Sequence, residues 1–343
     1  MTVPRRIFRW DLDKTYLVSD FDSFRYLIRV PFEKGADKVA VPGVTALLAA
    51  LRRTCEERGQ RPAVYFLSAS PPQIGAAIRD KLKLDGVQYE GIAFKDQIRH
   101  LVRGRFEVLR EQVGHKLSQL LRSSMRVEPG ASELLFGDDW ESDPFVYSLY
   151  ADIVAGRVRA SQCLGLLEAA GVHRHYLQRI EVLLERPMPA FDVDGIFILR
   201  QRGTPGADLA EFGPRLHWFD DYFECSLRLY AAGLLDSDGV VEVASALAST
   251  PSALARGYEA VCARSAVVRE RLVVVRRALT KAGLMEAVAA GRPLARVRYF
   301  VERMLSRDRR PALPLPQPGE LPDYRRLVEK WSRQGRKEAL NHD

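Results

Sequence analysis

Short apolar runs that alternate with helical patterns constrain the fold of this chain more than any other feature. The run from Ala63 to Leu67 is continuously apolar, as expected of a parallel strand that is buried on both faces. Strands alternating with helices predict an α/β fold, a doubly wound parallel sheet with helices on both faces. The other runs that predict strands are Ile7–Trp10, 91–94, 134–136 and 195–199.

Helical patterns fill the segments between these runs and most of the C-terminal part. Apolar residues recur at helical spacing from Val44 to Leu51, and beyond residue 237 the pattern is helical only. Pro311 to Pro322 is too rich in proline to form a helix, which predicts a linker or strap before a short basic tail. Further helices are expected from about residue 73 and over 96–123, 150–188, 219–235, 240–247 and 267–284.

These patterns predict two regions in the chain of 343 residues. The first is an α/β domain over residues 1–236, with a helical insertion at about 151–190. The second is a helical C-terminal region over residues 237–343, which contains the proline-rich segment 311–322. A chain of this length can bury a sizeable core in each arrangement that we considered, one large domain with an appendage or two domains.

The net charge of +8 suits an anionic partner, such as a phosphorylated metabolite, a nucleic acid or an anionic membrane surface. The four cysteines are scattered without a CxxC pair, so we expect reduced thiols rather than a disulfide framework or a zinc site. The N-terminal segment lacks the apolar run of a signal peptide, and no apolar stretch is long enough to cross a bilayer. We therefore expect a cytoplasmic protein whose membrane contact, if any, is peripheral.

Two carboxylates stand directly after the first predicted strand, in the segment from Asp11 to Thr15. At positions i and i+2 of an extended segment, Asp11 and Asp13 can both reach a site at the tip of the strand. One carboxylate could attack phosphorus and form an acyl phosphate. The other could protonate the leaving oxygen and then activate water. We expect Thr15, in the same segment, to bind the substrate.

Polar residues that suit a phosphoryl group follow at two later points of the chain. Ser68 comes directly after the strand that ends at Leu67, where its hydroxyl can hydrogen-bond a phosphoryl oxygen. Lys116 follows His115 in a predicted helix, and its ammonium can neutralise the charge of the phosphoryl group and of the nucleophile. Each of these residues alone would be weak support, because serine often ends strands and lysine is usually exposed.

A dense acidic cluster, from Gly137 to Asp143, follows the predicted strand at 134–136. Like charges crowded together are unfavourable unless a cation compensates them. Magnesium prefers hard oxygen ligands, commonly carboxylates together with substrate phosphate and water. Because the carboxyl ends of parallel strands lie at one edge of a sheet, the cluster is expected near Asp11.

This ordered set resembles the motifs of the haloacid dehalogenase superfamily of phosphotransferases. Four segments look like the catalytic domain of one branch of it, the actin-patch-associated phosphatidate phosphatases. The motifs that carry the wider resemblance are, in order, Asp11 with Asp13, Ser68, Lys116, and Asp138 with Asp143. The segments that carry the closer one are Val41-Pro42-Gly43, Ser68-Ala69-Ser70-Pro71-Pro72-Gln73, His115-Lys116, and residues 137–147.

The resemblance implies a role for each residue. Asp11 would be the nucleophile and Asp13 the general acid and base. Ser68 and Lys116 would bind the transferring phosphoryl group. The cofactor would be Mg2+, and the residues that the resemblance assigns to it are Asp11, the Asp13 carbonyl, and Asp138 with either Asp139 or Asp143.

Phe191-Asp192-Val193-Asp194-Gly195 also looks like a first motif of this superfamily. No second, third and fourth motif follow it, so a turn before the last strand is the preferred interpretation.

The segments between the motifs contain no clear cap domain, which predicts an open site that suits large or membrane-bound phosphomonoesters. The leading hypothesis is a phosphoric monoester hydrolase of the phosphatidate phosphatase type. One alternative is a phosphatase that acts on nucleic-acid ends or on a soluble phosphometabolite. Of the possible partners, nucleic acid is less favoured. Another is a non-catalytic phosphate-binding protein on the same scaffold. A lid formed by residues 151–190, with His173, Arg174 and His175 facing the phosphate, is a further hypothesis.

Overall fold

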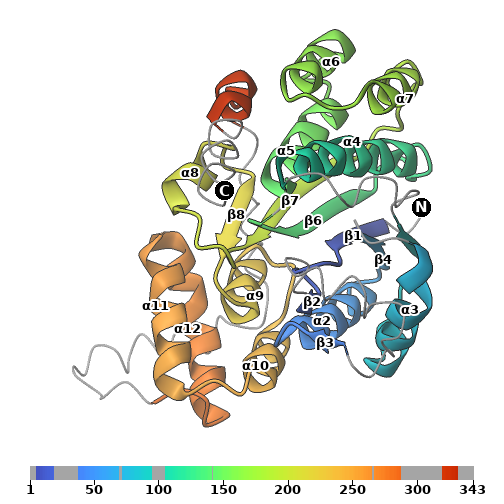
Figure 1. Ribbon diagram of the computed structural model, residues 1–343. Helices are drawn as coiled ribbons and strands as arrows, with labels where there is room; N and C mark the ends of the chain where they lie inside the picture. The colour runs from blue at the N-terminus through green and yellow to red at the C-terminus, as the bar shows by residue number, and fades with distance from the viewer. Residues whose placement is uncertain are drawn as a thin grey trace. The chain divides into compact units, whose positions relative to one another are not determined.

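The computed structural model describes most of the chain, and it divides into two compact units (Figure 1). The first unit comprises residues 1–41, 55–220 and 315–343, and the second comprises residues 42–54 and 221–314. The described residues are 5–18, 38–68, 72–94, 105–140, 142–264, 266–286 and 319–330.

A six-stranded sheet forms the centre of the first unit, with the strand order β5-β4-β1-β6-β7-β8. Every neighbouring pair in this sheet is parallel, which confirms the predicted α/β fold. The strands are β1 (Arg5–Asp11), β4 (Arg61–Leu67), β5 (Gly91–Ala93), β6 (Ser132–Asp138), β7 (Asp192–Leu199) and β8 (Leu216–Phe219). A separate antiparallel pair joins β2 (Leu17–Val18) and β3 (Val39–Ala40).

Two predictions about the last strands are wrong. The segment from Phe191 to Gly195 is no turn, because β7 already begins at Asp192, which pairs with Ser132 of β6. An ion pair between Asp194 and Arg6 of β1 compensates one of its charges. Nor is β7 the last strand, because β8 follows it in a segment too short to show a clear pattern.

Helices cover both faces of this sheet. Figure 1 shows α4 (Arg105–Ser124) and α5 (Asp143–Val154) on one face and α3 (Gly75–Leu84) on the other. Because side chains alternate along a strand, Ile7 belongs to the core beneath α4 and α5, while Trp10 points to the opposite face. There the ring of Trp10 stacks on Phe136 with ring centroids 3.8 Å apart.

The helical stretch predicted over residues 150–188 consists of three helices. These are the C-terminal part of α5, then α6 (Ala160–Ala169) and α7 (Arg174–Leu184). Gly156 and Gly171 follow the ends of α5 and α6 with φ values of 68° and 74°. This left-handed conformation ends a helix and favours glycine, so the two glycines set the division. Of the helix predicted over 96–123, residues 96–104 lie outside the described residues.

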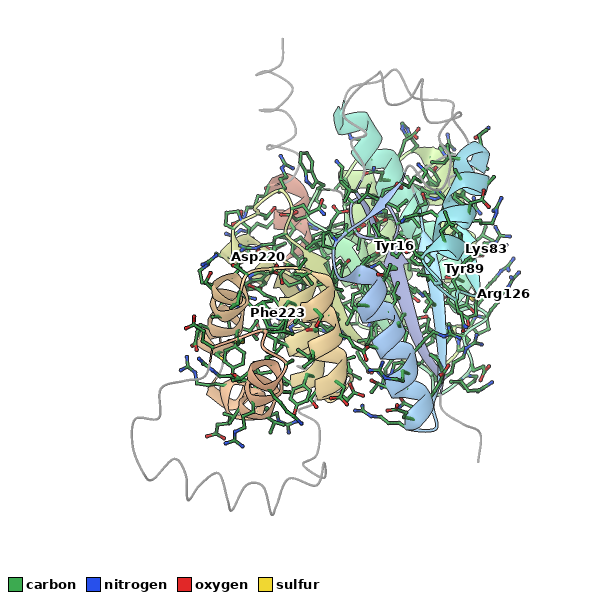
Figure 2. All side chains as sticks on the ribbon, turned by 90° about the horizontal axis from the view of Figure 1, so that it is seen from below. Tyr16, Lys83, Tyr89, Arg126, Asp220 and Phe223 are labelled. Atoms are coloured by element: carbon green, nitrogen blue, oxygen red, sulfur yellow. The ribbon has the colours of Figure 1, made fainter. Side chains whose placement is uncertain are left out.

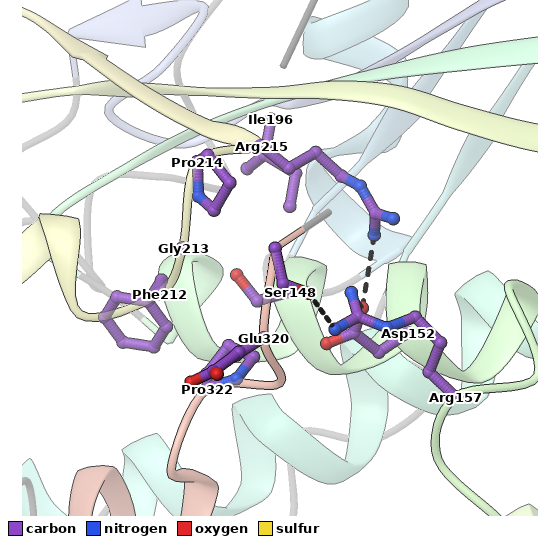
Figure 3. A pocket seen from close by; sticks show the side chains of 11 residues that line it. Ser148, Asp152, Arg157, Ile196, Phe212, Gly213, Pro214, Arg215, Glu320 and Pro322 are labelled. Carbon is purple, nitrogen blue, oxygen red and sulfur yellow. Dashed lines mark hydrogen bonds and ion pairs between the residues drawn. The ribbon is translucent and has the colours of Figure 1, made fainter. Parts of the chain in front are cut away.

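Residues 319–330 pack on the first unit, and residues 324–330 are helical. The Tyr324 hydroxyl donates a hydrogen bond of 2.6 Å to Asp152 of α5, which also pairs with Arg157 and Arg215. Arg157 in turn donates to the carbonyl of Gly319 at 2.6 Å. Figure 3 shows these two arginines at Asp152 beside a small cavity. The described end of the predicted strap is thus anchored to α5, whereas residues 311–318 lie outside the described residues.

The second unit is helical, as predicted for this part of the chain. Asp236 and Thr250 cap two of its helices through their side chains, which accept hydrogen bonds from Gly239 N and Ala253 N. The unit contains α9 (Tyr222–Ala231), α10 (Ser237–Ala246), α11 (Pro251–Ala263), α12 (Ala266–Lys281) and residues 44–54 of α2 (Val44–Glu57). The sequence patterns place the division at residue 236, whereas α9 groups with the second unit.

None of the helices in the described part of the chain has the length and hydropathy that a membrane span requires.

Candidate active site

The carboxyl ends of three neighbouring strands bring the predicted site residues together. β1 lies between β4 and β6, with Asp11 paired to Leu67 and Trp10 paired to Phe136. Asp11 ends β1, Ser68 follows β4 and Asp138 ends β6. Parallel pairing in this register therefore places residues from three distant segments at one edge of the sheet, where open α/β sheets build their sites.

Lys116 joins two buried carboxylates at the centre of the site. Its Nζ lies 2.7 Å from Oδ1 of Asp11, and it also forms a short ion pair with Oδ1 of Asp143. All three side chains have less than 2% of their surface exposed. Asp11 projects from the same face of β1 as Ile7 and Arg9, the face that α4 covers, and this is why a lysine on α4 reaches it.

Asp143 reaches the site because Gly137 has no side chain. A Cβ atom added at Gly137 would overlap the carboxylate of Asp143. Asp143 is the first residue of α5, and its Oδ2 accepts a hydrogen bond of 3.3 Å from the amide of Asp138. A carboxylate in the first turn of a helix is also favoured by the helix dipole. The glycine of the fourth motif thus allows a close approach of helix and strand.

Asp13, Thr15 and Ser68 complete the buried part of the site. Ser68 Oγ donates a hydrogen bond of 2.9 Å to Oδ2 of Asp13, and Thr15 Oγ1 donates one of 3.3 Å to Oδ2 of Asp138. Between them Lys14 adopts a φ of 61°, an uncommon conformation for a residue with a side chain. This turn lets Asp13 and Thr15 both point inward directly after the strand.

The carboxylate of Asp139 has different partners from those of its neighbour Asp138. It accepts hydrogen bonds of 2.8 to 2.9 Å from the backbone amides of Gln201, Arg202 and Thr204. These amides belong to the loop that follows β7, so Asp139 holds that loop against the end of β6.

Three carboxylates of the site could hold a metal ion. Asp11, Asp138 and Asp143 each offer an oxygen atom, and these atoms lie within 4.8 Å of one another. With Asp13 they make four buried acidic groups, and the ammonium of Lys116 pairs with two of them. An excess of buried negative charge is costly without a cation, and carboxylate oxygens are the ligands that Mg2+ prefers. The donor set therefore fits a hard divalent cation.

Two aromatic residues near the site were not predicted from the sequence. Tyr147 lies one helical turn after Asp143 on α5, and burial, with a further contribution from Asp143, raises its pKa well above the ordinary value. Its hydroxyl therefore stays neutral. Trp140 lies beside the site, with its amide 2.7 Å from Oδ1 of Asp138. The sequence signal for Trp140 was its position in the acidic segment 137–143. The signal for Tyr147 was its spacing of one helical turn from Asp143.

Two cations flank the ring of Trp140. Lys14 Nζ lies 4.0 Å from the ring centroid, and Arg202 Cζ lies 5.8 Å from it. Arg202 is carried by the loop that Asp139 holds. The rim of the site thus combines an aromatic ring with positive charge.

The basic residues predicted for a lid lie at the start of α7. His173 Nε2 is 3.8 Å from Glu111 of α4, and its ring stacks with that of His175. A role of these residues toward a phosphate stays a prediction.

Comparison with known proteins gives one match. Residues 10–162 match the family model of the phosphatidate phosphatase APP1 catalytic domain. The predicted resemblance is confirmed over this range. No curated protein and no solved structure shows a significant match. The matched range contains every predicted site residue from Asp11 to Asp143 and ends within α6, and it supports the assignment of a phosphatase.

Proposed function

We propose that this protein is a Mg2+-dependent phosphomonoester hydrolase that forms a phosphoaspartyl intermediate on Asp11 and acts on phosphatidate or a similar lipid. The observation that carries this proposal is the buried cluster of Asp11, Lys116 and Asp143 at the tips of the strands, inside the range that matches the family. It combines a nucleophile, a cation and a set of metal ligands in a single site.

Asp11 attacks the phosphorus atom, so that a bond forms from its carboxylate oxygen to phosphorus while the ester bond to the leaving group breaks. Lys116, at 2.7 Å, keeps the carboxylate of Asp11 ionised and in place. Asp13 donates a proton to the departing alkoxide. Its hydrogen bond from Ser68 fixes the carboxyl group in an orientation from which it can reach the leaving oxygen.

The second half of the reaction regenerates the enzyme. Asp13, now ionised, takes a proton from a water molecule as that water attacks the phosphoaspartate. The bond between phosphorus and the Asp11 oxygen then breaks, and inorganic phosphate leaves. One carboxyl group can perform both steps because its two protonation states are used in turn.

Asp11, Asp138 and Asp143 would hold the magnesium ion. When bound, the ion supplies positive charge that stabilises the phosphoryl oxygens. We assign Asp143 rather than Asp139 to this set, because the Asp139 carboxylate already accepts three backbone hydrogen bonds that hold the loop after β7. Thr15, through its hydrogen bond to Asp138, orients one of the ligands.

The rim of the site favours a lipid substrate over a small metabolite. Trp140 is an amphipathic ring of the kind enriched at membrane interfaces, and Lys14 and Arg202 place positive charge around it. Positive charge near a surface is attracted to anionic lipid. The protein would thus meet its substrate as a peripheral enzyme on an anionic membrane.

The test is hydrolysis of a generic aryl phosphate, followed by a substrate panel. Wild-type protein with Mg2+ should hydrolyse the aryl phosphate, and Asp11→Asn should lower turnover by at least about 10³-fold. Asp80→Asn, on the exposed surface of α3, is the matched control and should keep full activity. Wild-type activity in Asp11→Asn would refute the nucleophile assignment.

The panel should contain phosphatidate vesicles, soluble sugar phosphates and oligonucleotides with a 5′-phosphate. A preference for phosphatidate supports the lipid assignment. A preference for either of the other two would replace it while leaving the chemistry of Asp11 intact.

A further inference from the structure

We propose a second binding site in the first unit, for an anion that carries an apolar chain. A cavity of about 540 Å³ lies between the C-terminal part of α4 and the strands β1, β4 and β5. Neither the proposed catalysis nor the rim at Trp140 uses it. The proposal does not depend on the phosphatase function.

The floor of the cavity is apolar because of the layering of the fold. Side chains on one face of β1 and β4, such as Ile7 and Leu67, are buried in the core next to α4. At β5, on the edge of the sheet, Ile92 and the adjacent Phe94 are only half-buried. The cavity thus offers a strip of apolar surface along the sheet.

Four arginines line the same cavity, and two of them are neutralised within the protein. Arg9 forms a buried ion pair with Glu133. Arg5 lies 3.2 Å from Glu128, which also pairs with Arg61. One glutamate therefore serves two arginines. Glu90 also lines the cavity, and its carboxylate accepts a hydrogen bond from the amide of Val64.

The other two arginines, Arg122 and Arg126, line the wall that α4 provides. Both are exposed, and within the described ranges the structure shows no carboxylate paired with either. Arg122 lies in the last turn of α4 and Arg126 in the turn just beyond it, and both side chains line this one cavity. Figure 2 shows Arg126 at the surface of the first unit.

These features select a class of ligand. The volume is within the range of small-molecule pockets. Guanidinium groups bind carboxylates and phosphates through two parallel hydrogen bonds, and the apolar floor would accept an aliphatic chain. A long-chain carboxylate or alkyl phosphate satisfies both, whereas a small inorganic anion would leave the floor uncovered.

Calorimetric titration of the full chain with dodecanoate, which the enzyme cannot hydrolyse, tests the proposal. The wild type should bind dodecanoate more tightly than octanoate, and acetate should not bind. The double variant Arg122→Gln/Arg126→Gln should bind dodecanoate at least about tenfold more weakly, as expected for the loss of charge-assisted hydrogen bonds. Its turnover of aryl phosphate should equal that of the wild type.

The control is Arg159→Gln/Arg186→Gln. It removes two exposed arginines that do not line the cavity, one just before α6 and one after α7, and it changes the net charge by the same amount as the test variant. It should bind dodecanoate as the wild type does. The proposal fails if both double variants bind alike, or if Asp11→Asn removes binding, since the chain would then occupy the catalytic site. A failed aryl phosphate assay in the wild type would instead refute the proposed function alone.

Discussion

Arg9 and Asp11 are two positions apart on the side of β1 that faces α4, yet they belong to buried clusters that differ in charge balance. Arg9 donates to Glu133 through Nε at 2.9 Å, and the Tyr150 hydroxyl satisfies the other oxygen of Glu133 at 2.9 Å. Burial opposes the charge of Arg9, but Glu133 raises its pKa above the ordinary value. One positive and one negative group therefore neutralise each other in the interior.

The cluster at Asp11 has no such balance. Four carboxylates are buried at this edge of the sheet, and in the described part of the chain the ammonium of Lys116 pairs with two of them, those of Asp11 and Asp143. Proteins keep such an arrangement where it serves binding or catalysis rather than stability. The comparison teaches that sharing one face of a strand does not give two residues the same role. The charge balance of each cluster and its distance from the carboxyl end of the strand distinguish them.

The largest effect on stability is expected at the balanced cluster. Glu133→Gln would leave the guanidinium of Arg9 buried without a counter-charge, at a cost of about 3–5 kcal/mol in the free energy of unfolding. Asp138→Asn, in the acidic cluster, should cost much less, because it removes excess negative charge. Urea unfolding without metal measures both. A larger loss of unfolding free energy for Asp138→Asn than for Glu133→Gln would contradict the proposed difference between the two clusters.

Asp13→Asn should affect catalysis and leave the fold intact. Loss of the group that protonates the leaving oxygen should lower turnover by about 100-fold or more. The effect should be smaller with an aryl phosphate than with an alkyl phosphate, because an aryl oxide needs less protonation to leave. An equal loss with the two substrates would mean that Asp13 acts only in positioning. Steady-state rates with both esters distinguish these outcomes.

Magnesium should stabilise the protein through the acidic cluster. At a concentration of 100 times the dissociation constant, bound Mg2+ should add about 2.7 kcal/mol to the free energy of unfolding. Asp143→Asn should abolish this gain, whereas Asp139→Asn should retain it, because Asp139 holds the loop after β7 rather than the ion. Thermal unfolding of each variant with and without Mg2+ measures this gain in stability. The reverse pattern would transfer the ligand role to Asp139.

Tyr324→Phe should have the smallest effect. It removes one buried hydrogen bond to the charged Asp152, at a cost of about 1–2 kcal/mol, and should leave turnover nearly unchanged. Tyr89→Phe, whose ring contacts Phe66, is the matched control and should unfold like the wild type. If Tyr324→Phe lowered turnover strongly, residues 319–330 would be needed to position α5 and its Asp143.

Much of the fold and the site follows from the sequence alone. The apolar runs predicted the parallel strands, since strands buried on both faces are mostly apolar. The buried pair of Arg9 and Glu133 is an exception. The motif residues Asp11, Ser68 and Asp138 follow directly from those strands, so their meeting at one edge was predictable. Lys116 was predictable only through its order among the other motifs, because a single lysine in a helix has no distinctive pattern.

Only the tertiary structure decided the partners of residues that are similar in sequence. Asp139 and Asp143 belong to one acidic segment. Asp139 accepts hydrogen bonds from backbone amides after β7, whereas Asp143 forms an ion pair with Lys116. Strand β8 and the packing of residues 319–330 on α5 depend on contacts between distant segments, which a local pattern does not contain. The sequence pattern predicts which faces are buried. The partners of a buried charge depend on the tertiary packing of segments that are distant in the chain.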